Sequence, residues 1–123
     1  MQIKQLELKA IDIRMRALRM IYESKAGHLG GSMSMVDILV ALYYHKMNVR
    51  PENWQKIDRD RFILSKGHGA VCMYITMALR GFFDYDEIVR TYGKLDSAYG
   101  MHPCKVQLPG VECSSGSLGQ GLA

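Results

Sequence analysis

The sequence lacks the features of a membrane or secreted protein. No apolar run approaches the roughly 20 residues that a membrane-spanning helix needs. Met1 is followed by the charged, periodic segment 2–9 instead of the apolar core of a signal peptide. The three cysteines are an odd number, which argues against a disulfide framework and favours a reducing compartment. We therefore expect a cytoplasmic protein that makes no membrane contact.

The sequence also has little excess of either sign of charge. There are 16 Lys and Arg residues against 12 Asp and Glu residues, so the formal net charge is +4. This charge suits small anionic ligands, but it forms no basic stripe beside an aromatic platform, so we expect no nucleic-acid partner. The length of 123 residues allows one domain with one core.

What the sequence does contain is helical periodicity. The first 26 residues predict one long helix that Gly27 ends. Two neighbouring apolar stripes run along this helix, so we expect about half of its circumference to be buried. The first stripe consists of Ile3, Leu6, Ala10, Ile13, Ala17 and Ile21, and the second of Leu8, Ile11, Met15, Leu18 and Tyr22.

The rest of the chain predicts a mixture of helices and one strand. The expected elements are a helix from the capping box Ser34–Asp37 to about His45, a strand at Arg61–Leu64, a helix over 70–80, and a short helix from the capping box Asp84–Glu87 to about Tyr92. This order predicts an α/β layered domain. Because a single strand cannot form a sheet, we expect the fold to be incomplete at its C-terminus.

Three of the four histidines, His28, His68 and His102, lie in glycine-rich turns. Histidine titrates near neutrality and both donates and accepts hydrogen bonds, so it serves proton transfer and oxyanion contacts. His68, together with Lys66, also follows the carboxyl end of the predicted strand, where ligands bind in open α/β sheets. One such residue could be an ordinary loop histidine. Three of them at the ends of separate elements favour a shared site.

The segment Gly116–Gly121 has three glycines and predicts a backbone that presents its N–H groups to a flat or anionic ligand, or else an ordinary turn. It matches neither GxGxxG nor a nucleotide P-loop. Cys104 and Cys113 lie near His102 but lack a fourth ligand for structural zinc. We interpret them as incidental thiols and expect no metal site within this chain.

These motifs together resemble the transketolase family. The segment Gly27–Ser34 is similar to that family's loop beginning Gly-His-Pro-Gly, and Asp58–Gly69 is similar to its Asp-Arg-Asp-Arg-Phe…Gly-His-Gly segment. Gly110–Glu112 and Gly116–Gly121 are similar to its Gly-Val-Glu and Gly-Pro-Leu-Gly-Gln-Gly motifs. The order and spacing match throughout, and the resemblance covers essentially the whole chain.

The departures from the family pattern point to one branch of it. Leu29 and Ser117 stand where the family has proline, and Ala26 stands where the long-chain enzymes commonly have serine. These forms look more like the split transketolases, whose diphosphate-binding and pyrimidine-binding halves are separate polypeptides. This chain is similar to the N-terminal, diphosphate-binding subunit. The family's Gly-Asp-Gly metal signature does not occur in it, so we expect a truncated or partial subunit that is inactive alone.

The resemblance implies the α/β thiamine-diphosphate-binding fold, with three layers and a mostly parallel sheet, of which residues 1–123 are the N-terminal part of the diphosphate-binding domain. It implies transfer of a two-carbon ketol group from a ketose phosphate to an aldose phosphate in the pentose phosphate pathway. The implied cofactors are thiamine diphosphate and Mg²⁺, with metal ligands outside this chain. The implied partners are sugar phosphates and a complementary C-terminal, pyrimidine-binding subunit in a hetero-oligomer.

The resemblance also implies roles for single residues. His102 contacts the hydroxyl and carbonyl end of the donor and assists proton transfer, and His28 contacts the substrate. His68 lies against the cofactor diphosphate. The stretch between aminopyrimidine and diphosphate is lined by Gly116, Ser117 and Leu118.

Two alternatives stay open at this point. One is another thiamine-diphosphate enzyme such as deoxyxylulose-phosphate synthase, although the unbroken run Asp58–Phe62 and the loop Gly100–Pro103 favour transketolase. The other is a non-catalytic binding module that serves only as a partner for the other half.

Overall fold

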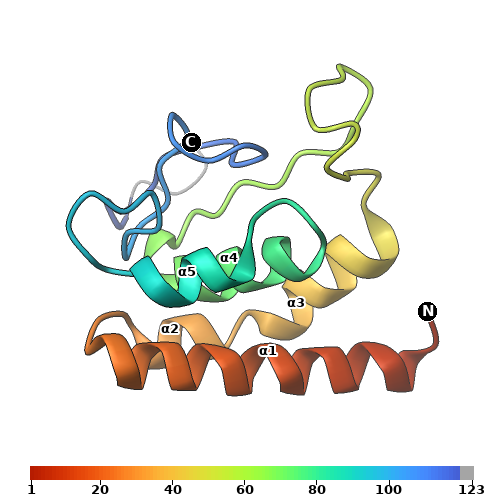
Figure 1. Ribbon diagram of the computed structural model, residues 1–123. Helices are drawn as coiled ribbons and strands as arrows, with labels where there is room; N and C mark the ends of the chain where they lie inside the picture. The colour runs from red at the N-terminus through yellow and green to blue at the C-terminus, as the bar shows by residue number, and fades with distance from the viewer. Residues whose placement is uncertain (120–123) are drawn as a thin grey trace.

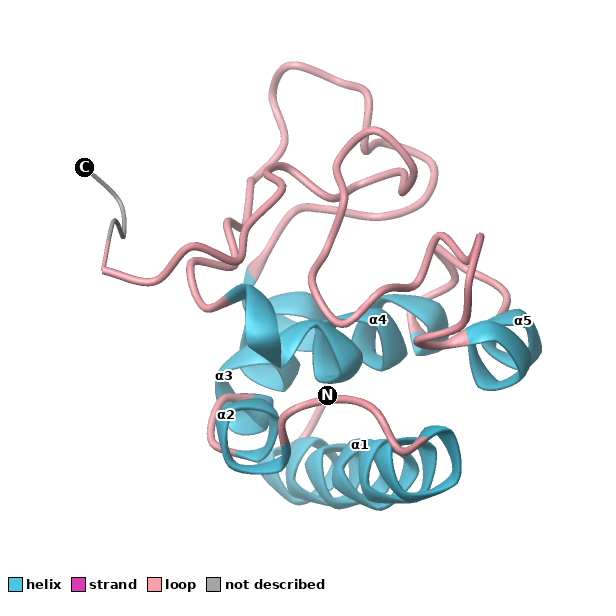
Figure 2. Ribbon diagram, turned by 90° about the vertical axis from the view of Figure 1, so that its left-hand side faces the viewer, coloured by secondary structure: helices cyan, strands magenta, loops and turns pink. Residues whose placement is uncertain are grey.

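The computed structural model describes residues 1–119 and shows a layer of helices covered on one side by loops (Figure 1). In chain order the helical elements are α1 (Ile3–Ser24), α2 (Leu29–Met33), α3 (Val36–Ala41), the π-helical turn η1 (Leu42–Lys46), the 3₁₀ turn η2 (Gly67–Gly69), α4 (Ala70–Leu79) and α5 (Tyr85–Thr91). The long loops lie on the side of α4 that faces away from α1 (Figure 2).

Helix α1 confirms the prediction of one long N-terminal helix. It begins where the backbone N–H of Gln2 donates to Oε1 of Gln5 at 2.9 Å. It ends at Lys25, whose φ of 55° is left-handed, and Gly27 follows with a φ of 115°. The inner face buries Ala10, Ile13, Ala17 and Met20 against α2, α3 and α4.

The expectation that both apolar stripes of α1 are buried is wrong. The side chains of the second stripe remain 52% to 71% exposed; they are Leu8, Ile11, Met15, Leu18 and Tyr22. The reason is the position of α1, which is the outermost element in both views, with the other helices on one side of it only. Periodicity identifies the apolar faces of a helix, but it does not say which of them the rest of the chain covers.

Helix α4 is the centre of the core. Each residue from Ala70 to Ala78 is buried, as the uniformly apolar sequence predicts. The helix packs against α1, α2, α3 and α5, and it ends at Gly81, whose φ of 98° suits glycine. Helix α5 begins at Asp84, where the predicted cap forms because the Asp84 carboxylate accepts from the backbone N–H of Asp86 at 3.0 Å.

The helix predicted after Ser34 differs from the structure in two ways. It is split into α3 and the π-helical turn η1, which buries Tyr43 and lets the Tyr44 hydroxyl donate to the Thr76 carbonyl at 3.1 Å. Its predicted cap is absent, because the Ser34 hydroxyl accepts a hydrogen bond from Nζ of Lys66 at 2.7 Å. A contact with a distant segment thus replaces the local cap.

The predicted strand Arg61–Leu64 is wrong for the described structure. The segment is extended but forms no strand, and none of the described residues, 1–119, is in a strand. A strand needs a neighbouring segment for its ladder of hydrogen bonds, and no described segment supplies one. The layered, mostly parallel sheet is therefore not observed, and the segment crosses above α4 as an extended trace (Figure 1).

Candidate functional site

Three imidazole rings meet at one end of the helical layer. His28 is the residue before α2, His68 lies in η2, and His102 lies in the loop after α5. The ring centroids of His28 and His68 are 5.5 Å apart, and those of His28 and His102 are 5.7 Å apart. The structure therefore brings together the three histidines that the glycine-rich turns singled out.

Glycine at position 31 allows α2 to approach the His68 ring. A Cβ atom on Gly31 would lie 2.3 Å from Cδ2 and 2.4 Å from Nε2 of His68, which is closer than real Cβ atoms come. The Ser32 hydroxyl also donates to the His68 carbonyl at 3.4 Å. The position of His68 thus depends on a bare backbone at Gly31.

The loop that carries His102 is held from the core and from the segment that follows it. The hydroxyl of Tyr74, on α4, donates to the Gly100 carbonyl at 2.9 Å. A Cβ atom on Gly116 would lie 3.3 Å from Cδ2 of His102. Pro103, next to His102, is buried, whereas the His102 side chain itself is exposed and accessible to a ligand.

The backbone of residues 115 and 116 packs against η2. A Cβ atom on Gly67 would lie 2.5 Å from the Ser115 carbonyl oxygen and 2.9 Å from the Gly116 nitrogen. Gly116 therefore lies between η2 and the His102 ring. Ser117 and Leu118, which were predicted with it, continue the chain from this point and are exposed. The last residues of the predicted glycine segment, 120 and 121, lie outside the described residues.

The electrostatic environment of the cluster favours a neutral His68. Partial burial lowers the pKa of His68 below its ordinary value, and His28, Lys66 and His102 lower it further. Nδ1 of His68 and the hydroxyl of Ser115 are buried and have no hydrogen-bond partner in the described structure. These atoms are ready to bind a ligand. Since none of these residues carries a carboxylate, the cluster suits an anion.

A buried ion pair connects two of the sequence motifs next to this site. Arg59, from the run Asp58–Phe62, pairs with Glu112, from the motif Gly110–Glu112. Arg59 also donates to the carbonyl of Trp54 and, at 3.2 Å, to that of Asp60. These contacts fix the start of the segment that reaches Ser115 and Gly116.

Sequence reasoning missed several of these supports. Gly31 and Gly67 could have been inferred from their place beside histidine, but the contacts that require glycine there come from distant segments. Tyr74 gave no signal, because a tyrosine in an apolar helix is read as core. Lys66 was singled out, but its bond to Ser34 was not.

Metal ligation and membrane insertion were also assessed over the described chain. Within residues 1–119 no group of three or more His, Cys, Asp or Glu side chains is placed to hold a metal ion. Cys72, Cys104 and Cys113 are free thiols. No helix in the described part of the chain has the length and apolar character to cross a membrane.

Comparison with known proteins defines the class. Residues 5–123 match the family described as "Transketolase, thiamine diphosphate binding domain". One of the two subunits of the apulose-4-phosphate transketolase of Phocaeicola vulgatus is 39% identical over 123 residues, which are 100% of this chain and 43% of that protein. The 6-deoxy-6-sulfo-D-fructose transketolase subunit SqwG of Clostridium sp. is 36% identical over 118 residues, 96% of this chain and 42% of that protein.

Solved structures agree with these sequence matches. The transketolase from Campylobacter jejuni superimposes with a TM-score of 0.88 at 33% identity, covering 98% of this chain and 19% of that one. The transketolase from Leishmania mexicana gives a TM-score of 0.87 at 31% identity, covering 94% of this chain and 17% of that one. The chain belongs to the transketolase family, in its thiamine-diphosphate-binding domain. It spans less than half the length of the curated relatives it matches.

Proposed function

We propose that this chain provides part of the diphosphate-binding half of a thiamine-diphosphate-dependent transketolase. The intact enzyme would move a two-carbon ketol group from a ketose phosphate to an aldose phosphate, as in the pentose phosphate pathway. The observation that carries the proposal is the meeting of His28, His68 and His102 beside the Gly116 backbone. Three imidazoles around bare backbone offer donors to the oxygens of a sugar phosphate and to a diphosphate.

The residues present fit the diphosphate end of the cofactor. The buried Nδ1 of His68 has no partner in the described structure, and Gly31 and Gly67 leave no space for side chains beside η2. We assign His68 to the diphosphate, and Gly116, Ser117 and Leu118 to the stretch that leads to the aminopyrimidine. When bound, thiamine diphosphate supplies the carbanion chemistry that breaks and forms the carbon–carbon bond.

The exposed rings of His28 and His102 are assigned to the sugar. His102 would hold and move a proton at the carbonyl and hydroxyl oxygens of the donor, because an imidazole can act as acid or base near neutral pH. His28, one ring away, would bind and orient the substrate. Each ring is close enough to the other for both to contact one small ligand.

The remaining parts of the proposal concern the intact assembly. Residues 1–123 would be the N-terminal part of the diphosphate-binding domain, with the extended segment Arg61–Leu64 forming a strand of its parallel sheet. Mg²⁺ would be held by ligands outside this chain. The partner would be a complementary pyrimidine-binding subunit, which the relatives named as transketolase subunits support. The free thiols fit a cytoplasmic location.

Histidine variants of the intact enzyme, assembled with its partner subunit, test the assignment. His102→Ala should lower kcat by roughly ten- to ten-thousandfold, as the loss of an acid–base or oxyanion group does. His28→Ala should raise the donor KM and leave cofactor affinity nearly intact, and His68→Ala should weaken cofactor binding. His45→Ala, at an exposed histidine on η1, is the matched control. If His28→Ala abolished cofactor binding and spared the donor KM, the roles would be wrongly assigned.

A further inference from the structure

The outer face of α1 has the pattern of a helix that pairs with another helix. Its exposed apolar side chains are spaced alternately by three and four residues: Leu8, Ile11, Met15, Leu18 and Tyr22. This spacing gives a period of 3.5 residues, which is that of the a and d positions of a coiled coil. We call these five residues the outer seam.

Scattered exposed apolar residues are normal on protein surfaces, but the outer seam is not scattered. Its residues form one continuous stripe along α1, on the side opposite the buried Ala10, Ile13 and Ala17. In Figures 1 and 2 none of the other described elements lies beyond α1 on this side. A narrow stripe with a strict heptad repeat fits one partner helix better than a broad protein surface.

The charges beside the outer seam choose between two orientations of a second α1. In a parallel pair, the flanking positions would bring Asp12 against Glu7 of the other copy and Arg19 against its Arg14, so like charges would meet. In an antiparallel pair, with Ile11 opposite Tyr22 of the other copy and Met15 opposite its Leu18, Asp12 lies beside Arg19. A two-fold axis repeats this opposite-charge contact on the other side.

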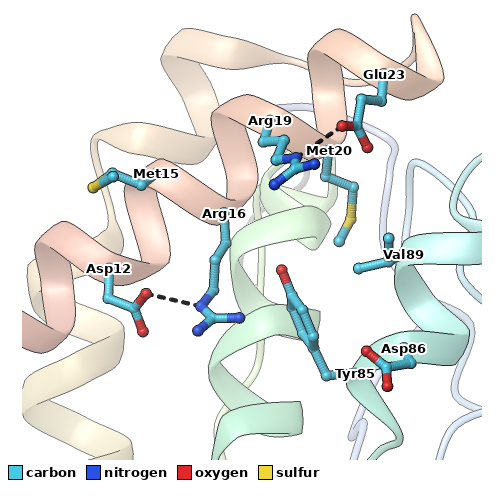
Figure 3. A pocket seen from close by; sticks show the side chains of 9 residues that line it. All are labelled: Asp12, Met15, Arg16, Arg19, Met20, Glu23, Tyr85, Asp86 and Val89. Atoms are coloured by element: carbon cyan, nitrogen blue, oxygen red, sulfur yellow. Dashed lines mark hydrogen bonds and ion pairs between the residues drawn. The ribbon is translucent and has the colours of Figure 1, made fainter.

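Both groups have free hydrogen-bonding capacity for this contact. Asp12 accepts from Nε of Arg16 through one carboxylate oxygen at 2.8 Å, and Arg19 donates through Nε to Glu23 at 2.8 Å (Figure 3). Arg16 is further held within the chain, since its guanidinium lies 4.7 Å from the centroid of the Tyr85 ring. The second oxygen of Asp12 and the terminal nitrogens of Arg19 make no hydrogen bond within residues 1–119.

We propose that α1 is a self-association surface, which pairs antiparallel with α1 of a second copy of this chain across a two-fold axis. The outer seam supplies the apolar contact, and the reciprocal pairs between Asp12 and Arg19 set the orientation. The surface lies away from the histidine cluster, so the pairing leaves the proposed active site open.

The first test is sedimentation velocity of the full chain over a range of concentrations. We expect a reversible dimer, and we expect Met15→Glu to raise its dissociation constant at least a hundredfold, since it places two carboxylates in the apolar seam. Leu95→Glu is the control, because Leu95 is exposed in a loop apart from α1. Helical circular dichroism checks that each variant is folded. A chain that stays monomeric at high micromolar concentration, or a dimer that Met15→Glu leaves intact, overturns the proposal.

Charge reversal tests the orientation and separates contacts between copies from those within one copy. Asp12→Arg and Arg19→Asp should each weaken the dimer at least tenfold at low salt. The double variant should restore it, since opposite charges again meet across the axis. If only the bonds to Arg16 and Glu23 mattered, the double variant would be weaker than either single one, and that result refutes the proposed pairing. Association only with the complementary subunit, and not with a second copy, also refutes it.

Discussion

Arg59 and Glu112 form an ion pair whose side chains are only 8% and 15% exposed. Arg59 belongs to the polar connection before the extended segment, and Glu112 belongs to the loop that leads to the histidine cluster. The pair therefore joins two parts of the chain that are distant in sequence and supports the segment whose backbone lies against η2.

Removing one partner of this pair should destabilise the protein strongly. Arg59→Met leaves the Glu112 carboxylate buried without its cation, and such a loss costs about 3–5 kcal/mol in the free energy of unfolding. Urea unfolding followed by circular dichroism measures it. The double variant Arg59→Met and Glu112→Leu should recover most of the loss, because no charge is then left unpaired. Single variants as stable as the wild type would show that the pair is not a structural tie.

Two neighbouring glycines of α2 should respond differently to alanine. Gly31→Ala places a methyl group against the His68 ring, so it should destabilise the protein by about 1–3 kcal/mol and shift the His68 imidazole resonances. Gly30→Ala meets nothing within 4 Å and should be neutral or slightly stabilising. Thermal unfolding and NMR compare the two. Equal behaviour would contradict the close approach of α2 to the ring.

The stability of the protein should depend on the protonation of His68. Its pKa in the folded state is lowered, chiefly by partial burial, whereas a histidine of the unfolded chain titrates near pH 6.5. Between these two pKa values the unfolded chain binds more protons, so the free energy of unfolding rises with pH. The contribution is present above the unfolded pKa and is lost as the pH falls through the folded pKa.

Urea titrations between about pH 8 and about pH 5 would measure this dependence. His68→Asn should flatten the slope, and His45→Asn, at an exposed histidine of η1, should leave it unchanged. A slope that survives in His68→Asn would assign the pH dependence to other groups.

Two tyrosines with similar hydrogen bonds separate stability from site geometry. Tyr74→Phe and Tyr44→Phe each remove a hydroxyl that donates to a backbone carbonyl, of Gly100 and Thr76 respectively, so each should cost about 1 kcal/mol. Only Tyr74→Phe should loosen the loop of His102. Hydrogen exchange of residues 100–102 should therefore quicken in that variant alone, and equal exchange in both would refute the positioning role of Tyr74.

Local sequence rules predicted the elements that depend on local contacts. Helices α1 and α4 follow from apolar periodicity, and Asp84 caps α5 as its position before the helix requires. The rules were wrong where distant segments decide. Ser34 bonds to Lys66 instead of capping α3, and Arg61–Leu64 lacks a described neighbour with which to form a ladder.

The same division applies to the candidate site. Glycine-rich turns identified His28, His68 and His102, because the residues around each ring are informative by themselves. The sequence could not show that Gly31 contacts His68 or that Tyr74 holds Gly100, since these contacts join segments that are far apart. The roles assigned to these residues and to Ser117 and Leu118 stay predictions.

The histidine cluster has a consequence for the order in which the chain folds. Its rings and the Gly116 backbone come from four separate segments, whereas α1 and α4 need only local hydrogen bonds to form. Closing such long loops costs entropy before any contact within the cluster can stabilise it. The helical layer should therefore assemble first and the cluster last. Nascent chains and early refolding species should have native helix content while their imidazoles are still solvated and independent of one another.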